Sequence, residues 1–332
     1  MPEMNRAVGV RQCAGNEYLP TGLRHRNGNP GVSQRPATIA FLPVVFISAE
    51  LSAGGEYMAE STVQAGLGQV KHIVAVASGK GGVGKSTTAV NLALALAREG
   101  QAVGILDADI YGPSLPKMLG VADTVQPQVV NGNAFVPVPA QGLASMSIGY
   151  LTSAATPMVW RGPMAGGALV QMMEQTLWAA LDVLVVDMPP GTGDIQLTLS
   201  QKARVSGAVI VTTPQDIALL DARKGIEMFR KVDVPVLGIV ENMAQHICSN
   251  CGHVEHIFGE GGGEKVAAEY HTRLLGSLPL DRRIREKGDA GNPIVVADPD
   301  GEIARCYRDV ARQLLAALAE TSVKAPEINI ED

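Results

Sequence analysis

The sequence predicts an α/β protein with a mostly parallel, doubly wound sheet and helices on both faces. From about residue 69 onward, apolar β-branched runs alternate with helix-forming runs through short linkers, and one strand-to-helix junction carries a glycine-rich phosphate-binding loop. Hydrophobic residues make up 46% of the 332-residue chain, whereas aromatic residues make up only 4%. Small aliphatic side chains in this proportion suit strands that are buried on both faces.

The first strand and helix enclose the glycine-rich motif. Residues 71–77 are apolar and β-branched, which predicts a strand, and residues 87–98 are an Ala- and Leu-rich run that predicts a helix ending at Gly100. Between them, residues 79–86 read G-K-G-G-V-G-K-S and fit the P-loop pattern G-x-x-x-x-G-K-S/T. This motif in this setting predicts a nucleotide-binding site.

Each residue type in the loop has a physical role toward a phosphate chain. Glycines let the backbone wrap closely around phosphate oxygens, and the N–H groups at the start of the following helix face the anion. Lys85 is expected to neutralise the β- and γ-phosphates, and the Ser86 hydroxyl to ligate Mg²⁺. The expected nucleotide-binding residues are Gly79, Lys80, Gly81, Gly82, Val83, Gly84, Lys85, Ser86 and Thr87.

The second strand, residues 102–106, is followed by the carboxylates Asp107 and Asp109. Ligands of open parallel sheets bind outside the carboxyl ends of the strands. In an extended segment these two side chains would point the same way, so that one supports the metal shell and the other orients or deprotonates the attacking water. An aspartate-rich turn is the alternative for this segment, but the upstream loop favours catalysis.

The next strand, residues 181–187, is a buried apolar run that ends at Asp187. This is the usual place for the Walker-B acid that holds Mg²⁺, often through water. Residues 188–194 follow as M-P-P-G-T-G-D. Stiff prolines beside flexible glycines predict a loop with a few distinct arrangements, which can order against a γ-phosphate.

The last strands and the last helix follow the same pattern. Residues 208–212 and 236–240 are two further predicted strands, and Asn242 follows the second. An asparagine amide can donate and accept, and so can read an adenine edge, although asparagine at a strand end is also ordinary turn chemistry. In the final helix, Cys306 is expected to be a small buried hydrophobe. It shares an apolar face with Ile303, Val310, Leu314 and Leu318.

The second informative motif is C-S-N-C-G-H, which contains Cys248 and Cys251. Two thiolates at this spacing can bind one soft metal centre, but a tetrahedral site or a cubane cluster needs four ligands. His253 and His256 could complete a zinc site within one chain, or a second subunit could bring its own pair across a two-fold axis. A redox dithiol is the third possibility, although the helix start expected of a thioredoxin-like site is missing.

Composition excludes several classes of partner and location. The formal net charge of −6 and the lack of a basic stripe argue against nucleic acid as a partner. No run reaches the roughly 20 apolar residues that a membrane span needs, so we expect no membrane partner. Four cysteines in a chain of this length do not make a disulfide framework, which favours a reducing, cytoplasmic location.

Three regions are expected along the chain. Residues 1–65 mix Gly, Pro, Asn and Arg without periodicity and predict a poorly ordered extension, which is a start-site artefact if translation begins at Met58. Residues 66–320 are expected to form the P-loop ATPase domain with its C-x-x-C metal loop. Residues 321–332 read as a loose acidic tail.

Together these motifs resemble the Mrp/ApbC-type iron–sulfur carrier ATPases, a branch of the deviant Walker-A group that also holds MinD- and ParA-like proteins. The resemblance covers about residues 69–318, and the cysteine loop with its flanks selects the branch. The motifs that carry it lie at residues 78–87, 107–114, 160–164 (W-R-G-P-M), 185–194, 212–215, 240–243, 248–253 and 258–263 (F-G-E-G-G-G).

The resemblance implies roles for particular residues. Lys80 would reach across a homodimer to the partner's nucleotide, Asp109 would position the lytic water, and Asn242 would contact adenine. ATP and Mg²⁺ would be the cofactors of this site.

The resemblance also implies a cargo. Cys248 and Cys251 of both subunits would hold one 4Fe–4S cluster between them, for transfer to apoproteins and for exchange with assembly scaffolds. Nucleotide state would alter the dimer interface and so the exposure of the cluster.

Many bacterial members carry a small MIP18-like domain before the ATPase domain, and residues 1–65 show no matching pattern. The rival functions are a MinD/ParA-like positioning ATPase and a zinc-stabilised ATPase with another output. The acidic end at residues 325–332 lacks a basic amphipathic membrane helix, and the net charge argues against DNA binding. Neither positioning output explains the cysteine loop.

Overall fold

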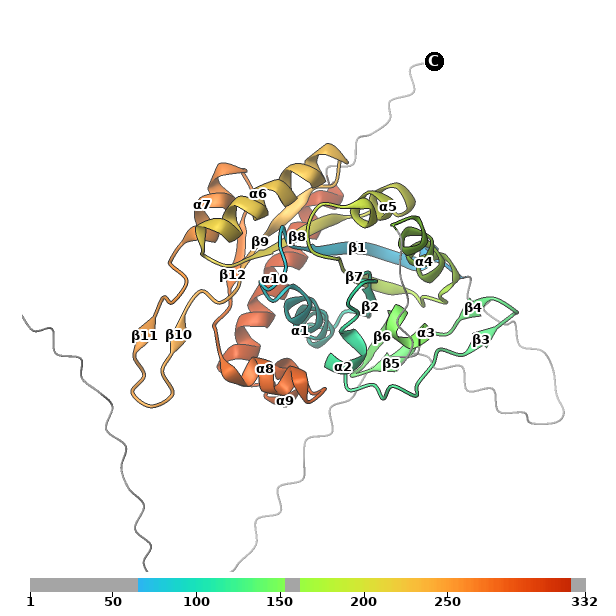
Figure 1. Ribbon diagram of the computed structural model, residues 1–332, viewed down its shortest axis with the longest axis horizontal. Helices are drawn as coiled ribbons and strands as arrows, with labels where there is room; N and C mark the ends of the chain where they lie inside the picture. The colour runs from blue at the N-terminus through green and yellow to red at the C-terminus, as the bar shows by residue number, and fades with distance from the viewer. Residues whose placement is uncertain (1–64, 153–161, 324–332) are drawn as a thin grey trace, which may run out of the picture. The chain divides into compact units, whose positions relative to one another are not determined.

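The computed structural model describes residues 65–152 and 162–323, where an eight-stranded sheet separates two layers of helices (Figure 1). All neighbouring strands are parallel except the last pair, β6 and β5, so the predicted fold class is confirmed. In spatial order the strands are β12 (Leu274–Ser277), β9 (Val236–Glu241), β8 (Gly207–Thr212), β1 (Val70–Ala77), β7 (Leu181–Asp187), β2 (Val103–Asp107), β6 (Leu143–Ser147) and β5 (Val138–Ala140).

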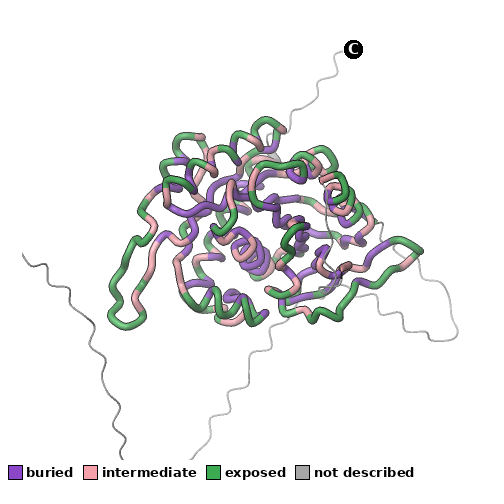
Figure 2. The backbone as a smooth tube through the Cα atoms, viewed as in Figure 1, coloured by how far each residue is buried: buried purple, intermediate pink, exposed green. Residues whose placement is uncertain are grey.

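The central strands are apolar throughout because both of their faces are buried. In β1, Val74 and Val76 pack into one hydrophobic core, while Ile73 and Ala75 pack into the other. This alternation between two cores produces the near-continuous apolar run that the sequence shows. The buried strands occupy the centre of the fold in Figure 2.

Two groups of helices cover the two faces. Residues of α1, α10, α9, α2 and α8 contribute to the first core, and residues of α4, α5, α6 and α7 contribute to the second. The first group comprises α1 (Lys85–Arg98), α2 (Leu115–Met118), α8 (Arg282–Asp289), α9 (Ile294–Ala297) and α10 (Glu302–Val323). The second group comprises α4 (Gly162–Gln175), α5 (Asp194–Lys202), α6 (Asp216–Lys231) and α7 (Gly262–Glu269).

Several short elements complete the described chain. They are η1 (Leu67–Gln69), β3 (Val129–Val130), β4 (Ala134–Phe135), α3 (Ile148–Leu151), β10 (His246–Ile247) and β11 (Val254–Glu255). The pairs β3–β4 and β10–β11 are small antiparallel hairpins outside the main sheet. The β10–β11 hairpin projects away from the sheet and carries the cysteine motif in its turn (Figure 1).

One edge of the main sheet is formed by β5. This strand is antiparallel to β6, and the exposed Pro139 at its middle lies opposite Ala144. Proline has no backbone N–H to donate and within sheets is confined to edges, strand starts and bulges. Its position is consistent with an edge strand.

Some expectations concern the ends of the chain. The predicted extension at residues 1–65, with Met58, lies almost wholly outside the described residues, as do Trp160 and Arg161 of the W-R-G-P-M motif. Helix α10 continues to Val323, three residues into the segment expected to be the tail. Cys306 is half-buried against the first core, beside the fully buried face that it was expected to share.

None of the helices within residues 65–152 and 162–323 has both the length and the apolar character that crossing a bilayer requires.

Candidate functional site

The P-loop joins β1 to α1 at the carboxyl edge of the sheet (Figure 1). Gly82 and Gly84 both have a φ of 82°, in the left-handed region that glycine adopts without steric cost. Gly84 is the N-cap of α1 and provides no side-chain cap, so the first N–H groups of that helix face the loop. Gly79 lies so close to α6 that a Cβ there would overlap the Asp221 carbonyl oxygen. The loop is therefore preformed for an anion.

The lysine of the loop forms a buried ion pair with the end of β7. Lys85 Nζ lies 2.6 Å from Asp187 Oδ1 and 3.2 Å from Ser86 Oγ, and the Lys85 and Asp187 side chains are 7% and 0% exposed. Burial raises the pKa of Asp187, while the Lys85 ammonium opposes that rise. The pair thus neutralises two charges that would otherwise be buried alone.

The same carboxylate fits a magnesium ion. Asp187 Oδ2 is buried and has no hydrogen-bond partner within the part of the chain that the structure describes. Ser86 Oγ and the carboxylate supply the hard oxygen ligands that Mg²⁺ prefers. These residues could therefore hold Mg²⁺, and the magnesium site stays a prediction.

The two aspartates after β2 differ in burial and in their surroundings. The strand ends at Asp107, which is fully buried, and the chain then turns so that its carboxylate accepts hydrogen bonds from that turn. Its donors are Asp109 N at 3.1 Å, Ser114 N at 3.1 Å, Leu115 N at 3.2 Å and Ser147 Oγ at 3.1 Å. The expectation that both carboxylates point toward the phosphates stays a prediction, because Asp107 and Asp109 both interact with Lys85.

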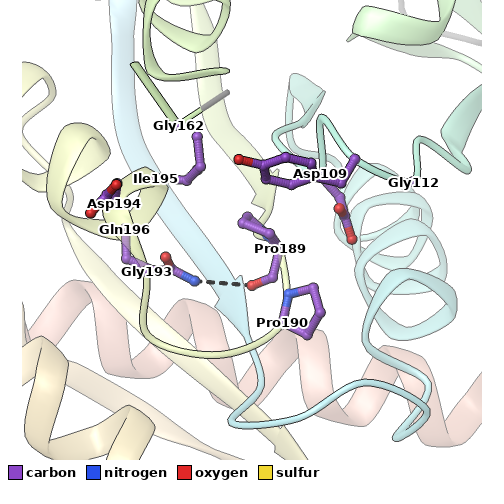
Figure 3. Close-up of a pocket in the computed structure, with 10 residues that line it drawn as sticks. Asp109, Gly112, Gly162, Pro189, Pro190, Gly193, Asp194, Ile195 and Gln196 are labelled. Atoms are coloured by element: carbon purple, nitrogen blue, oxygen red, sulfur yellow. Dashed lines mark hydrogen bonds between the residues drawn. The ribbon is translucent and has the colours of Figure 1, made fainter. Parts of the chain in front are cut away.

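Asp109 instead faces an open pocket between the two loops that follow β2 and β7 (Figure 3). The pocket has a volume of about 580 Å³. Its lining residues are Asp109, Tyr111, Gly112, Gly162, Pro189, Pro190, Gly193, Asp194, Ile195 and Gln196. Burial raises the pKa of Asp109, and Lys85 opposes the rise. Asp109 therefore combines a place in an open pocket with an electrostatic interaction with the P-loop lysine.

Gln196 is a site residue that the sequence reasoning missed. Its Nε2 donates to Pro189 O at 3.0 Å (Figure 3). It also donates to Gly191 O at 3.0 Å and so holds the proline–glycine loop. The side chain is 1% exposed although glutamine is polar. In the sequence, Gln196 lies between Ile195 and Leu199 at the start of α5. This position beside two buried apolar residues could have predicted that Gln196 is buried.

Asn242 contacts the P-loop directly. Its Nδ2 donates to Val83 O at 2.8 Å, and the side chain is only 6% exposed. Because the amide nitrogen is bonded to Val83, the predicted adenine contact would use the Asn242 amide oxygen, and it stays a prediction. Lys80 is half-buried, and its own carbonyl accepts a hydrogen bond from Ser78 Oγ at 2.8 Å.

The cysteine motif forms the tip of the β10–β11 hairpin. Cys248 N donates to His253 O at 2.9 Å, and Gly252 N donates to Cys248 O at 2.8 Å with a φ of 71° at Gly252. Backbone N–H groups of Asn250 and Cys251 point at the Cys248 sulfur and lower the pKa of its thiol. Cys248 is half-buried, Cys251 is exposed, and both are free thiols.

Among the described residues, none joins Cys248 and Cys251 as a third metal ligand. Within residues 65–152 and 162–323, no group of three or more His, Cys, Asp and Glu side chains is arranged to hold a metal ion. His256 Nδ1 instead hydrogen-bonds Ala244 O at 3.0 Å, and His253 Nε2 lies 3.9 Å from Glu255. Completion of a zinc site by these histidines is therefore not favoured.

Comparison with known proteins gives one matching family model, ParA, described as the NUBPL iron-transfer P-loop NTPase, over residues 69–315. A relative from Pseudomonas fragi, named iron-sulfur cluster carrier protein, is 66% identical over 74% of this chain and 86% of its own. The protein of that name from Escherichia coli K12 is 62% identical over 77% of this chain and 69% of its own. A Mus musculus relative, named iron-sulfur cluster transfer protein NUBPL, is 51% identical over 75% of this chain and 78% of its own.

Solved structures agree with this result. A nucleotide-binding protein from Archaeoglobus fulgidus in complex with ADP shares 37% identity and a TM-score of 0.63, covering 73% of this chain and 93% of that one. The cell division ATPase MinD of Pyrococcus furiosus has a TM-score of 0.56 at 22% identity, covering 74% and 99%. The second likeness concerns the fold alone.

Proposed function

Because the chain belongs to the family of NUBPL iron-transfer P-loop NTPases, we propose that it is an ATP-dependent carrier of iron–sulfur clusters. In this proposal two copies of the chain bind one 4Fe–4S cluster between their cysteine hairpins and deliver it to apoproteins. The free thiols suit a reducing compartment, and we place the protein in the cytoplasm.

One observation carries the cargo half of the proposal. The two thiols at the tip of the β10–β11 hairpin are accessible, the Cys248 thiol has a lowered pKa, and no third ligand accompanies them in the described chain. A cubane cluster takes four thiolates. A second hairpin related by a two-fold axis supplies the missing two, so the homodimer is the unit that carries the cluster.

The nucleotide half follows from the buried ion pair. When ATP enters the P-loop, Lys85 would exchange Asp187 for the β- and γ-phosphates, and Ser86 and Asp187 would hold Mg²⁺. The ion would supply positive charge that offsets the charge of the phosphates. Asp109 at the pocket rim orients the attacking water, and Lys80 of the partner subunit reaches the same phosphates. Asp107 keeps its loop folded and does not touch the nucleotide.

Paired variants test the two halves separately. After anaerobic reconstitution with iron and sulfide, the wild type should bind about four iron atoms per pair of chains. Cys248→Ala combined with Cys251→Ala should lose this iron and its visible absorbance while still hydrolysing ATP. Lys85→Ala should lose hydrolysis while keeping the iron, because it removes the phosphate ligand and leaves the hairpin untouched.

Cys306→Ala is the matched control, since that thiol lies on α10 against the first core. Its iron content should equal that of the wild type. Tightly held zinc at about one per chain, unaffected by dissociation of the dimer, would instead support the zinc-stabilised alternative.

A further inference from the structure

The P-loop and the cysteine hairpin are joined by one short segment of chain. Strand β9 ends at Glu241, Asn242 follows it, and residues 243–247 alone separate Asn242 from Cys248. Figure 1 shows β9 leading into β10 at the edge of the sheet where the P-loop lies. This segment is therefore the shortest stretch of chain through which a change at the P-loop could reach the cysteine hairpin.

At one end the segment is bonded to the P-loop. Asn242 Nδ2 donates to Val83 O at 2.8 Å, and both residues are buried. A Cβ added to Gly84 would overlap Asn242 Nδ2, so the Asn242 amide packs directly against the loop at Gly84. The next residue is Lys85, whose side chain is paired with Asp187. A change of partner at Lys85 therefore acts on the backbone that Asn242 holds.

At the other end the segment is bonded to the hairpin. Ala244 O accepts a hydrogen bond from His256 Nδ1 at 3.0 Å, and His256 lies just beyond the returning strand β11. Ala244 N also donates to Leu278 O at 3.0 Å, which ties the segment to the chain after β12. The hairpin is thus anchored through His256 to a residue only two positions from Asn242.

Between these two anchors the backbone is held in a conformation that few side chains adopt. Met243 has a φ of 57°, in the left-handed region, although it is not a glycine. Such conformations persist only where surrounding contacts impose them, and they recur at switch regions. Here the imposing contacts are the Asn242 bond to Val83 and the two bonds of Ala244.

We propose that Asn242 and His256 are positioning residues that transmit the nucleotide state of the P-loop to the cysteine hairpin of the same chain. The inference rests on the proposed function, because it requires a cluster on the hairpin. Neither residue touches the cluster: Asn242 acts through Val83 and the segment 242–244, and His256 acts through Ala244.

The test compares the rate of cluster transfer with and without Mg-ATP. Full-length dimer carrying the cluster is mixed with an apoferredoxin of the 4Fe–4S type, and transfer is followed by the visible absorbance of the acceptor. The rate with ATP divided by the rate without it measures the coupling. We expect His256→Ala to lower this ratio by about fivefold or more, toward one, while the rate without ATP and the spectrum of the bound cluster stay unchanged.

His256→Asn should restore the ratio, since the asparagine Nδ2 can replace the imidazole Nδ1 as donor to Ala244 O. Asn242→Asp keeps an acceptor oxygen but has no donor for Val83 O. It should therefore also lower the ratio of transfer rates with and without ATP toward one. Combined with His256→Ala it should lose no more than either change alone. His253→Ala is the matched control, because its imidazole lies at the hairpin tip and its side chain is 68% exposed. It should keep the wild-type ratio.

The outcomes separate the inference from the proposed function. A wild type that binds no cluster overturns the proposed function. A wild type that transfers its cluster at the same rate with and without ATP overturns the coupling inference and leaves cluster binding intact. A coupled wild type whose His256→Ala and Asn242→Asp variants remain equally coupled overturns the inference alone, and so does a His256→Asn variant that behaves like His256→Ala.

Discussion

The carboxylate of Asp107 is fully buried and accepts hydrogen bonds from four donors. Burial and the neighbouring Asp187 carboxylate nonetheless raise its pKa to about 7. The register explains the neighbour, because Asp107 and Asp187 are paired across β2 and β7. Two carboxylates that share one buried edge therefore compete for ionisation, and the Lys85 ammonium can neutralise only one of them.

This competition predicts a pH dependence of stability. The pKa of Asp107 in the folded chain lies above its ordinary value of 3.8, so the folded chain binds more protons than the unfolded one between about pH 4 and pH 7. The free energy of unfolding therefore falls as pH rises through that window. Asp107→Asn removes the titrating group. The free energy of unfolding of the wild type minus that of the variant should therefore decrease by up to about 1.4 kcal/mol per pH unit as pH rises through this window.

Urea unfolding of the protein free of metal and nucleotide measures this difference across the window. Asp182→Asn provides a control of opposite sign, because a hydrogen bond from Lys71 lowers the pKa of Asp182. Its stabilising contribution should disappear as pH falls below about 4. A difference between wild type and Asp107→Asn that does not change with pH would contradict the prediction.

Sequence reasoning reached single residues where a motif fixes their spacing and chemistry. It picked out Lys85 and Asp187, and the structure pairs them at 2.6 Å. It could not separate Asp107 from Asp109, because their difference depends on a turn that folds back to present its N–H groups. It also could not find the bond from Asn242 to Val83, which joins residues 159 positions apart.

At the scale of elements, strands buried on both faces were the easiest to predict. The expected strand at residues 181–187 matches β7 (Leu181–Asp187), and the expected helix at 87–98 lies within α1 (Lys85–Arg98). The antiparallel β5 and the two small hairpins were not predicted, since strands of two or three residues carry too little periodicity to recognise.

Strand β9 precedes both Asn242, which contacts the P-loop, and the cysteine hairpin. Gly238 within this strand packs closely against its neighbour β12. A Cβ there would lie 2.6 Å from Leu275 Cγ and 2.8 Å from Arg273 O on the neighbouring β12 side. Gly238→Ala should therefore destabilise the fold by about 1–3 kcal/mol, as overpacking a core does. Denaturant unfolding of the variant measures the loss.

Gly167→Ala is the matched control, because this glycine lies in α4 and a Cβ there would meet no atom within 4 Å. Alanine in a helix interior should leave stability unchanged or raise it by up to about 1 kcal/mol. Equal effects of the two substitutions would show that β9 and β12 can move apart at low cost.

At the scale of the whole molecule, the fold places the P-loop and the cysteine hairpin in different parts of the chain. The P-loop, Asp187 and Asp109 lie along the carboxyl edge of the sheet, while the thiols lie on a hairpin outside it. In the proposed function each chain would contribute most of a nucleotide site but only two of the four thiolates that a cluster needs. The proposal therefore requires a second copy of the chain for the cluster and not for the hydrophobic core.

Mixing chains tests that dependence. Wild-type chains are mixed with the Cys248→Ala, Cys251→Ala double variant and allowed to exchange before reconstitution. If the cluster bridges two chains, an equal mixture should hold about a quarter of the wild-type iron, because only pairs of two intact chains have four thiols.

A site completed within one chain would hold about half of the iron instead, and this result would exclude the bridged arrangement. Mixing wild type with the Cys306→Ala variant controls for the exchange procedure and should leave the iron content unchanged.

Pro139 in the edge strand β5 bears on how the protein behaves at high concentration. A long, flat strand edge is a template on which a neighbouring molecule can add its own strand, and repetition of that step builds fibres. Here the edge strand is three residues long, and one of them has no N–H to offer. Lateral growth at this rim is thereby disfavoured, so this edge of the sheet gives a neighbouring molecule little on which to add a strand.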